Sequence, residues 1–372
     1  MTDNSNLKLL KGLRAAAPFM ADLVPYDPRY LPARSYLNAN ENPYGLSREV
    51  AAKIAARFVE EESGPLGLNR YPAPLADVLR SRLAQRTTLL PEQILIGNGG
   101  DELIADLIFA WGGEGRSLLI APPGFSSYEL SAGLNATGIR RIWRKADFQL
   151  DEAAILEAAK EGADDLIMLA SPNNPTGDCL SAGFVEELLA ATDALVMIDQ
   201  AYIEFAAAEF DLIPLLDSHP NLVILRTFSK AWGLAGLRIG YLLGHPQVIS
   251  ELVKIRQPYS VDSFSMLAAE CVLDEDAAYA SQVAEIIAER QRLTSILASI
   301  PELEVFPSEA NFFLLRMERA VELWEYLYRE LGILTRDFSG SQGLRACLRI
   351  SVGQPAENDA FVAALREFLN RY

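Results

Sequence analysis

Apolar and polar positions alternate in blocks along the middle of the chain, from about residue 94 to residue 245. Short β-rich apolar runs recur there, at Ile94–Ile96, Ser117–Ala121, Ile139–Trp143, Leu166–Ala170, Ala194–Ile198, Leu222–Leu225 and Ile239–Leu243. Segments of helical pattern lie between most of them, such as Glu102–Ala110, Leu150–Ala159 and Ala182–Ala191. This alternation is typical of a mainly parallel sheet covered by helices on both faces, so we expect an α/β fold.

The C-terminal third predicts a smaller α+β unit. A helical stretch from Ser263 to Ser299 is interrupted at Asp274–Asp276 and ends before Pro301. The elements expected after it are strands at Glu304–Phe306, Asn311–Leu315, Ile333–Arg336 and Cys347–Ser351, and helices at Ala320–Glu330 and Pro355–Tyr372. Four prolines within residues 1–35 predict an extended arm. We expect a large domain over residues 46–258 and a small domain built from residues 36–45 and 259–372.

Composition limits the classes of function. The net charge of the 372-residue chain is −17, which disfavours nucleic acid and anionic membrane surfaces as partners. Only two histidines and three scattered cysteines are present, so we expect neither a metal site nor a disulfide framework. With no secretory signal pattern and no apolar run long enough to span a membrane, we expect a cytoplasmic protein.

Residues capable of chemistry follow four of the expected strands, where an α/β sheet places its ligands. Gly97–Glu102 opens a helix after the first strand, which makes either an anion site or a tight turn. Ser171–Gly177 reads equally as a plain turn. Asp199 could be a helix cap, and Lys230 a surface lysine, but a lysine among small apolar residues also suits Schiff-base chemistry.

Taken together, these segments resemble the pyridoxal-phosphate (PLP) aminotransferases of fold type I, and among them most closely the histidinol-phosphate aminotransferases. The similarity extends in order over nearly the whole chain. It rests on Leu37–Gly45, Asn69–Pro72, the stretch around Asp101, Asn173–Gly177, Asp199–Phe205, Thr227–Arg238 and Leu348–Gly353.

The resemblance implies roles around the cofactor ring. Lys230 would form the internal aldimine and then move the proton between Cα and C4′. Asp199 would pair with the pyridine nitrogen and keep the ring protonated. Tyr202 and Asn174 would hydrogen-bond to O3′. Phe125 would stack on the ring, its alternative role being that of an ordinary core aromatic.

The same resemblance implies a site for the cofactor phosphate. Its ligands would be Arg238, the hydroxyl groups of Thr227 and Ser229, and the N–H groups of Gly100 and Asp101. Tyr71 matches a tyrosine that reaches the phosphate from the neighbouring subunit, which implies a homodimer with composite active sites. Tyr71 could otherwise be a tyrosine packed beside a proline turn.

Two arginines are implied to bind substrate. Arg349 matches the arginine that holds an α-carboxylate, and Arg336 matches the one that binds the phosphate of histidinol phosphate. Arg336 could instead form a surface ion pair beside Asp337. Tyr26 of the arm and Asn42 complete the expected substrate-binding set.

Three departures from the family pattern bear on the substrate. Gln200 stands where glutamate is usual, Phe125 where tyrosine is usual, and Gly124 where threonine is common. The expected reaction is transfer of the amino group of L-histidinol phosphate to 2-oxoglutarate. An aromatic amino acid aminotransferase and a threonine-phosphate decarboxylase remain open. A non-catalytic regulator would need a DNA-binding module, for which the chain has neither spare length nor suitable charge.

Overall fold

The larger of two sheets is mainly parallel, as the sequence predicts. A computed structural model describes residues 31–60 and 67–371, so most of the expected arm, including Tyr26, lies outside the described residues. The larger sheet has the order β2 (Ile94–Gly97), β8 (Gly240–Gly244), β7 (Leu222–Thr227), β6 (Leu195–Asp199), β5 (Leu166–Ala170), β3 (Ser117–Ile120) and β4 (Gly138–Arg141). Only β8 runs antiparallel to its neighbours.

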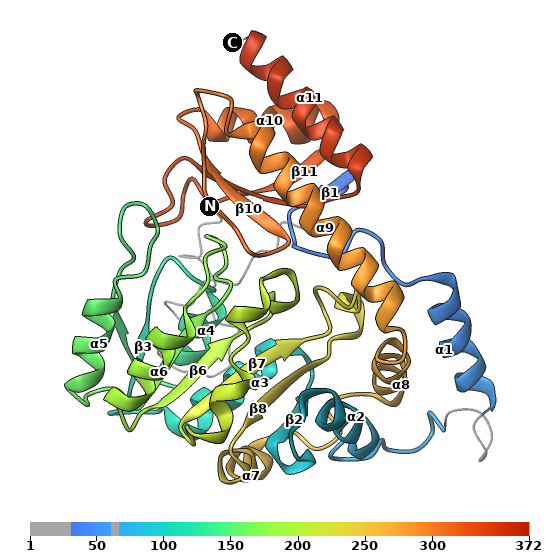
Figure 1. Ribbon diagram of the computed structural model, residues 1–372, viewed down its shortest axis with the longest axis vertical. Helices are drawn as coiled ribbons and strands as arrows, with labels where there is room; N and C mark the ends of the chain where they lie inside the picture. Colours follow the sequence, from blue (N-terminus) through green and yellow to red (C-terminus); the bar gives the residue numbers. More distant parts are fainter. Residues whose placement is uncertain (1–30, 61–66, 372) are drawn as a thin grey trace, which may run out of the picture.

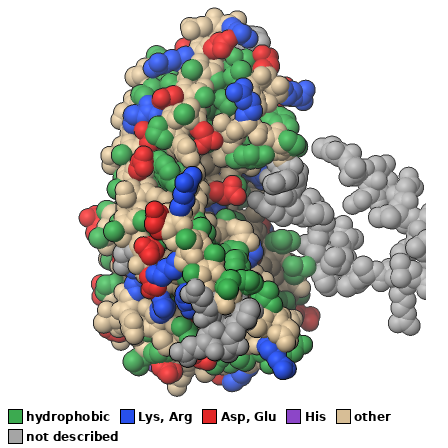
Figure 2. Space-filling model, turned by 90° about the vertical axis from the view of Figure 1, so that its right-hand side faces the viewer, with side chains coloured by type: hydrophobic (Ala, Val, Ile, Leu, Met, Phe, Trp, Pro, Cys, Tyr) green, Lys and Arg blue, Asp and Glu red, His purple; other side chains and the backbone are tan. Residues whose placement is uncertain are grey.

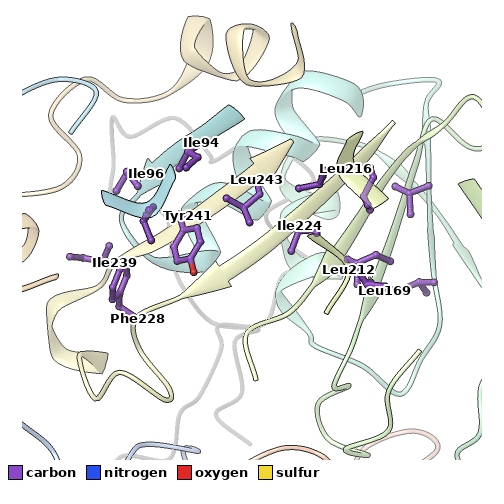
Figure 3. Packing of buried hydrophobic residues seen from close by; sticks show 14 of the residues in the cluster. Ile94, Ile96, Leu169, Leu212, Leu216, Ile224, Phe228, Ile239, Tyr241 and Leu243 are labelled. Atoms are coloured by element: carbon purple, nitrogen blue, oxygen red, sulfur yellow. The ribbon is translucent and has the colours of Figure 1, made fainter. Parts of the chain in front are cut away.

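Helices cover both faces of this sheet, because successive side chains of each buried strand point to opposite faces. Leu195 and Met197 of β6 pack on the side of α3 (Gly99–Trp111), α4 (Ser127–Leu134) and α7 (Pro246–Ile255). Val196 and Ile198 pack on the other side, which α2 (Asp77–Thr87), α5 (Glu152–Lys160), α6 (Ala182–Ala191) and α8 (Ser263–Val272) cover. Figure 3 shows this second core, with side chains from β2, β7 and β8 in one layer.

The smaller sheet lies above the larger one in Figure 1. Its order is β1 (Ser35–Leu37), β11 (Ile333–Asp337), β12 (Cys347–Ser351), β10 (Phe312–Arg316) and β9 (Glu304–Val305). It packs with α9 (Asp276–Leu297), α10 (Ala320–Leu331) and α11 (Pro355–Arg371) around a separate apolar core. β1 pairs in parallel with β11, and the segment that follows β1 passes between the two units, where the Asn38 carbonyl accepts from Arg349 and the Ala39 carbonyl accepts from Lys230.

Helix α8 packs with the larger sheet. Met266 and Ala269 of α8 belong to the core of the larger sheet, whereas Val283 and Ile286 of α9 belong to the core of the smaller one. The break expected at Asp274–Asp276 is therefore where the core changes. We propose that the large domain extends through α8, beyond the residue 258 expected from sequence, and that the remaining domain limits stand as predicted.

Ion pairs join α1 (Arg48–Glu60) and α2 to α8 and to the connection that follows it. Lys53 lies 2.9 Å from Asp274, Arg82 lies 2.5 Å from the same carboxylate, and Arg57 lies 2.8 Å from Glu270. Figure 2, which views the side of the molecule that carries α1 and α9, shows charged side chains of both signs among apolar ones. Within the described residues, no helix is long and apolar enough to cross a membrane.

Candidate active site

A cavity of about 380 Å³ lies at the carboxyl ends of β5, β6 and β7, with the smaller sheet forming its opposite wall. This is the edge at which an α/β sheet binds its ligands. Twelve of the residues expected from sequence line the cavity, namely Gly100, Asp101, Phe125, Asn174, Asp199, Tyr202, Thr227, Ser229, Lys230, Arg238, Arg336 and Arg349. They come from segments 249 residues apart in the chain.

Two expected site residues are not brought to this cavity. The Asn42 amide donates to the Ala231 carbonyl at 2.8 Å and to Gln282 Oε1 at 3.2 Å, so it anchors the loop beside Lys230. Tyr71 is 82% exposed and stacks on Tyr259 with 4.6 Å between ring centroids. Within one chain, neither side chain faces the cofactor region.

Lys230 is held in the cavity by the main chain. Its Nζ donates to the Ala39 carbonyl at 2.9 Å. Desolvation, followed by the positive charge of Arg349, lowers the pKa of Lys230 to about 8. An amine with that pKa is partly deprotonated near neutral pH, which suits both nucleophilic attack and proton transfer.

Asp199 ends β6 with its carboxylate held at both oxygens. Tyr128 Oη donates to Oδ2 at 2.9 Å, and the Ala201 N–H donates to Oδ1 at 2.9 Å. Burial raises the pKa of Asp199 to about 6, although both hydrogen bonds oppose the rise. A cationic ring nitrogen beside this carboxylate would stabilise its ionised form. Tyr128 belongs to this site, although no sequence pattern assigned it a role.

The start of α3 and Arg238 form an anion site. A Cβ on Gly99 would lie 2.6 Å from Arg238 Nη2, so the guanidinium group crosses the helix start at a position where any larger residue would displace it. Arg238 contacts Asp101 Oδ2 at 3.3 Å and Ser229 Oγ at 3.4 Å. The Thr227 hydroxyl lies in the same wall. Helix N–H groups, hydroxyl groups and a guanidinium group together fit a phosphate.

Arg336 and Arg349 form the opposite end of the cavity. They are direct partners in the antiparallel pairing of β11 with β12, so both side chains reach the same side of the small sheet. Arg349 donates to Asn174 Oδ1 and, at 2.6 Å, to the Asn38 carbonyl. Both guanidinium groups lie within 6 Å of the Phe338 ring, Arg336 at 5.7 Å and Arg349 at 5.5 Å from its centroid.

A second cavity, of about 660 Å³, continues beyond Phe125. Phe125, Asn174, Arg336 and Arg349 line both spaces, so the two share a wall. Trp143 and Phe338 add aromatic surface to the second space. There is therefore room for a substrate side chain next to the arginine pair.

Comparison with known proteins assigns the family. The sequence pattern of the aminotransferase class I and II family matches residues 36–365, and the chain belongs to this family. A histidinol-phosphate aminotransferase of Carboxydothermus hydrogenoformans is 41% identical over 354 residues, which cover 94% of this chain and 97% of the relative.

Solved structures agree with this assignment. The structure of histidinol-phosphate aminotransferase from Sinorhizobium meliloti in complex with pyridoxal-5′-phosphate superimposes with a TM-score of 0.87 and 26% identity, covering 96% of this chain and 98% of that one. L-threonine-O-3-phosphate decarboxylase from Porphyromonas gingivalis superimposes with a TM-score of 0.79 and 27% identity, covering 90% and 99% of the two chains. The present chain is a PLP-dependent aminotransferase of fold type I.

The residues at the cavity fit this cofactor. The glycine-lined start of α3 with Arg238 matches the phosphate, the buried Asp199 carboxylate matches a protonated ring nitrogen, and Lys230 supplies the amine. These groups lie at separate places around one cavity. The cavity therefore offers the three kinds of group that pyridoxal phosphate needs, namely an anion site, a carboxylate and an amine.

Proposed function

We propose that this chain transfers the amino group of L-histidinol phosphate to 2-oxoglutarate, giving imidazole-acetol phosphate and L-glutamate, as a step of histidine biosynthesis. The observation that carries the proposal is the Arg336–Arg349 pair, which lies in the same cavity as Lys230. Since Arg238 already serves an anion site at the start of α3, this pair is left for an anion on the substrate. The name of the Carboxydothermus relative supports the same substrate.

Each residue around the cofactor would have a separate role in the reaction. When bound, pyridoxal phosphate supplies an electron sink for the charge that forms at the substrate Cα. Lys230 would move the proton between Cα and C4′, a role that its lowered pKa suits. Asp199 would hold the proton on the ring nitrogen. Tyr202 and Asn174 would donate to O3′, and Phe125 would stack on the ring.

The arginine pair accepts an anion in both halves of the reaction. Histidinol phosphate presents a phosphate, and 2-oxoglutarate presents a second carboxylate in its place. A guanidinium pair makes charge-assisted hydrogen bonds with either anion. The second cavity, with Trp143 and Phe338 in its wall, offers aromatic surface for the imidazole ring.

We also propose a homodimer with composite sites, in which Tyr71 of each chain reaches the cofactor phosphate of its partner. The support is that Tyr71 is exposed and lies outside its own cavity. Tyr26 keeps the substrate-binding role that the resemblance implies, whereas the contacts of Asn42 give that residue a role in anchoring the loop beside Lys230. The cytoplasm remains the predicted compartment.

The test is a single-turnover reaction of the holo-protein without keto acid. L-Histidinol phosphate, L-phenylalanine and O-phospho-L-threonine are added to separate samples, and conversion of the cofactor to its amine form is followed by absorbance. Fastest conversion by histidinol phosphate supports the proposal. Faster conversion by phenylalanine indicates an aromatic aminotransferase, and release of carbon dioxide from phosphothreonine indicates a decarboxylase like the Porphyromonas neighbour.

A further inference from the structure

Three successive residues, Asn38, Ala39 and Asn40, each bind a different functional side chain. The Asn38 carbonyl accepts from Arg349 at 2.6 Å, and the Ala39 carbonyl accepts from Lys230 at 2.9 Å. The Asn40 side-chain amide donates to Tyr202 Oη at 3.0 Å. The segment that passes between the two sheets therefore touches the substrate end, the amine and the phenol of the site at once.

Asn40 is held by hydrogen bonds from both its side chain and its main chain. Ser351 Oγ donates to Asn40 Oδ1 at 2.9 Å and accepts from the Asn40 N–H at 2.8 Å. Asn311 donates to the Asn40 carbonyl at 3.0 Å. In this orientation Oδ1 accepts from the Ser351 hydroxyl group and Nδ2 donates to Tyr202 Oη. Asn40 is 1% exposed and has a φ of 56°, a conformation that asparagine tolerates better than most residues.

This orientation decides where the Tyr202 proton points. Tyr202 Oη accepts a hydrogen bond from Asn40, so its own proton is directed elsewhere, and the side chain lines the cofactor cavity. The ring is held edge-to-face on Phe312, with 5.0 Å between centroids. The phenol is thus restrained at both its ring and its oxygen.

We propose that Asn40 is a positioning residue that makes Tyr202 a hydrogen-bond donor to the cofactor. The inference rests on the proposed contact of Tyr202 with O3′. Through Ser351, Asn40 also ties this phenol to β12, the strand that carries Arg349. The Tyr202 hydroxyl is therefore joined by two hydrogen bonds to Ser351, which stands two positions after Arg349 on the same strand.

The expected consequence is a change in the pKa of the lysine-linked cofactor. A hydrogen bond donated to O3′ stabilises the negative charge on that oxygen. The oxygen then holds less strongly the proton on the nitrogen that would link Lys230 to the cofactor. Losing that bond raises the pKa of the linked cofactor, on the order of one unit for a bond to a charged acceptor. The charged groups around Tyr202 are Arg349, Asp199, Asp101 and Lys230, and none is altered by replacing Asn40.

The test is an absorbance titration of holo-protein with pH for Asn40→Gly, Tyr202→Phe and the double variant. Glycine tolerates the positive φ, so Asn40→Gly removes the amide without straining the backbone. We expect each single variant to raise the pKa of the linked cofactor, and the double variant to match Tyr202→Phe alone. Ser351→Ala removes the hydroxyl group that holds the Asn40 amide and leaves the strand intact. This variant should raise the pKa of the linked cofactor by a smaller amount. Additive shifts in the double variant would overturn the inference.

The matched control is Asn221→Gly. Asn221 is a partly buried asparagine whose amide ties loop carbonyls at the far ends of the strands, the nearest being that of Thr192 at 3.0 Å, and this variant should keep the wild-type titration. A shift with Tyr202→Phe but none with Asn40→Gly refutes the positioning role alone. No shift with Tyr202→Phe refutes the proposed contact of Tyr202 with O3′ and the positioning role with it.

Discussion

Arg336 and Arg349 are cross-strand partners on β11 and β12, and both line the cavity that contains Lys230. Like charges placed directly opposite each other on a sheet are destabilising. Here the Asn174 side chain, the Asn38 carbonyl and the Phe338 ring offset part of that cost. An anion bound between the two arginines would replace the remaining repulsion with attraction. Binding of a substrate anion should therefore stabilise this part of the small sheet.

Gly99→Ala should weaken binding of pyridoxal phosphate by about tenfold or more. The new Cβ would lie 2.6 Å from Arg238 Nη2 and displace the guanidinium group from the start of α3. The matched control is Gly162→Ala, since Gly162 also has a positive φ, of 64°, with no atom close to the new Cβ. Cofactor titration by fluorescence should show weaker affinity only for Gly99→Ala. Equal affinities for the two variants would contradict the assigned phosphate site.

Asp199→Asn should stabilise the cofactor-free chain at pH 8. Burial raises the pKa of Asp199 from 3.8 to about 6, so the folded chain binds this proton more tightly than the unfolded chain. The stabilisation from the protonated carboxyl is complete below 3.8 and is lost as the pH rises through 6. Asparagine has no such loss. We expect the free energy of unfolding of Asp199→Asn, measured in urea, to rise relative to that of the wild type between pH 5 and pH 8, by on the order of 2 kcal/mol.

With the cofactor bound, the wild type should be the more stable of the two proteins. A protonated ring nitrogen pairs with the Asp199 carboxylate but not with an amide, so pyridoxal phosphate should stabilise the wild type more than Asp199→Asn. The variant should also lose kcat, because the ring no longer retains its proton. An equal gain in stability from the cofactor in both proteins, with kcat retained, would refute the role of Asp199.

Mixing Tyr71→Ala with Lys230→Ala should restore activity if the sites are composite. Each mixed dimer then contains one site with both an intact Lys230 and a partner's intact Tyr71. Random exchange of subunits gives roughly a quarter of the wild-type activity. The measurement is turnover after co-expression, against each variant alone. Activity no higher than the sum of the two separate variants would show that Tyr71 acts within its own chain or not at all.

The strands of the larger sheet could be predicted because they are apolar throughout. β5 is predicted with its observed bounds, and β6 and β7 to within two residues at each end, since a strand buried on both faces gives a continuous apolar run. Asp199 directly follows one such run and Lys230 follows the next by five residues, and the family resemblance then implied their roles.

Other parts of the site leave little signal in a sequence. The Asn38 and Ala39 carbonyl groups act through the main chain, which any residue supplies. The bond from Tyr128 to Asp199 joins residues 71 positions apart, on α4 and β6. The pairing of β1 with β11 depends on a three-residue strand, too short to show a pattern. Asn42 shares its motif with Asn40, and only the fold shows which of the two faces the cavity.

The central claim is that the Arg336–Arg349 pair recognises the phosphate of the substrate. The most direct test measures single-turnover kcat/KM for L-histidinol phosphate and for L-histidinol, in the wild type and in Arg336→Gln. Removing the phosphate should cost the wild type a large factor, and should cost Arg336→Gln roughly ten- to a hundredfold less, because one charge-assisted contact is already lost. If removing the phosphate costs both proteins the same factor, Arg336 does not bind it, and the assignment of histidinol phosphate loses its main structural support.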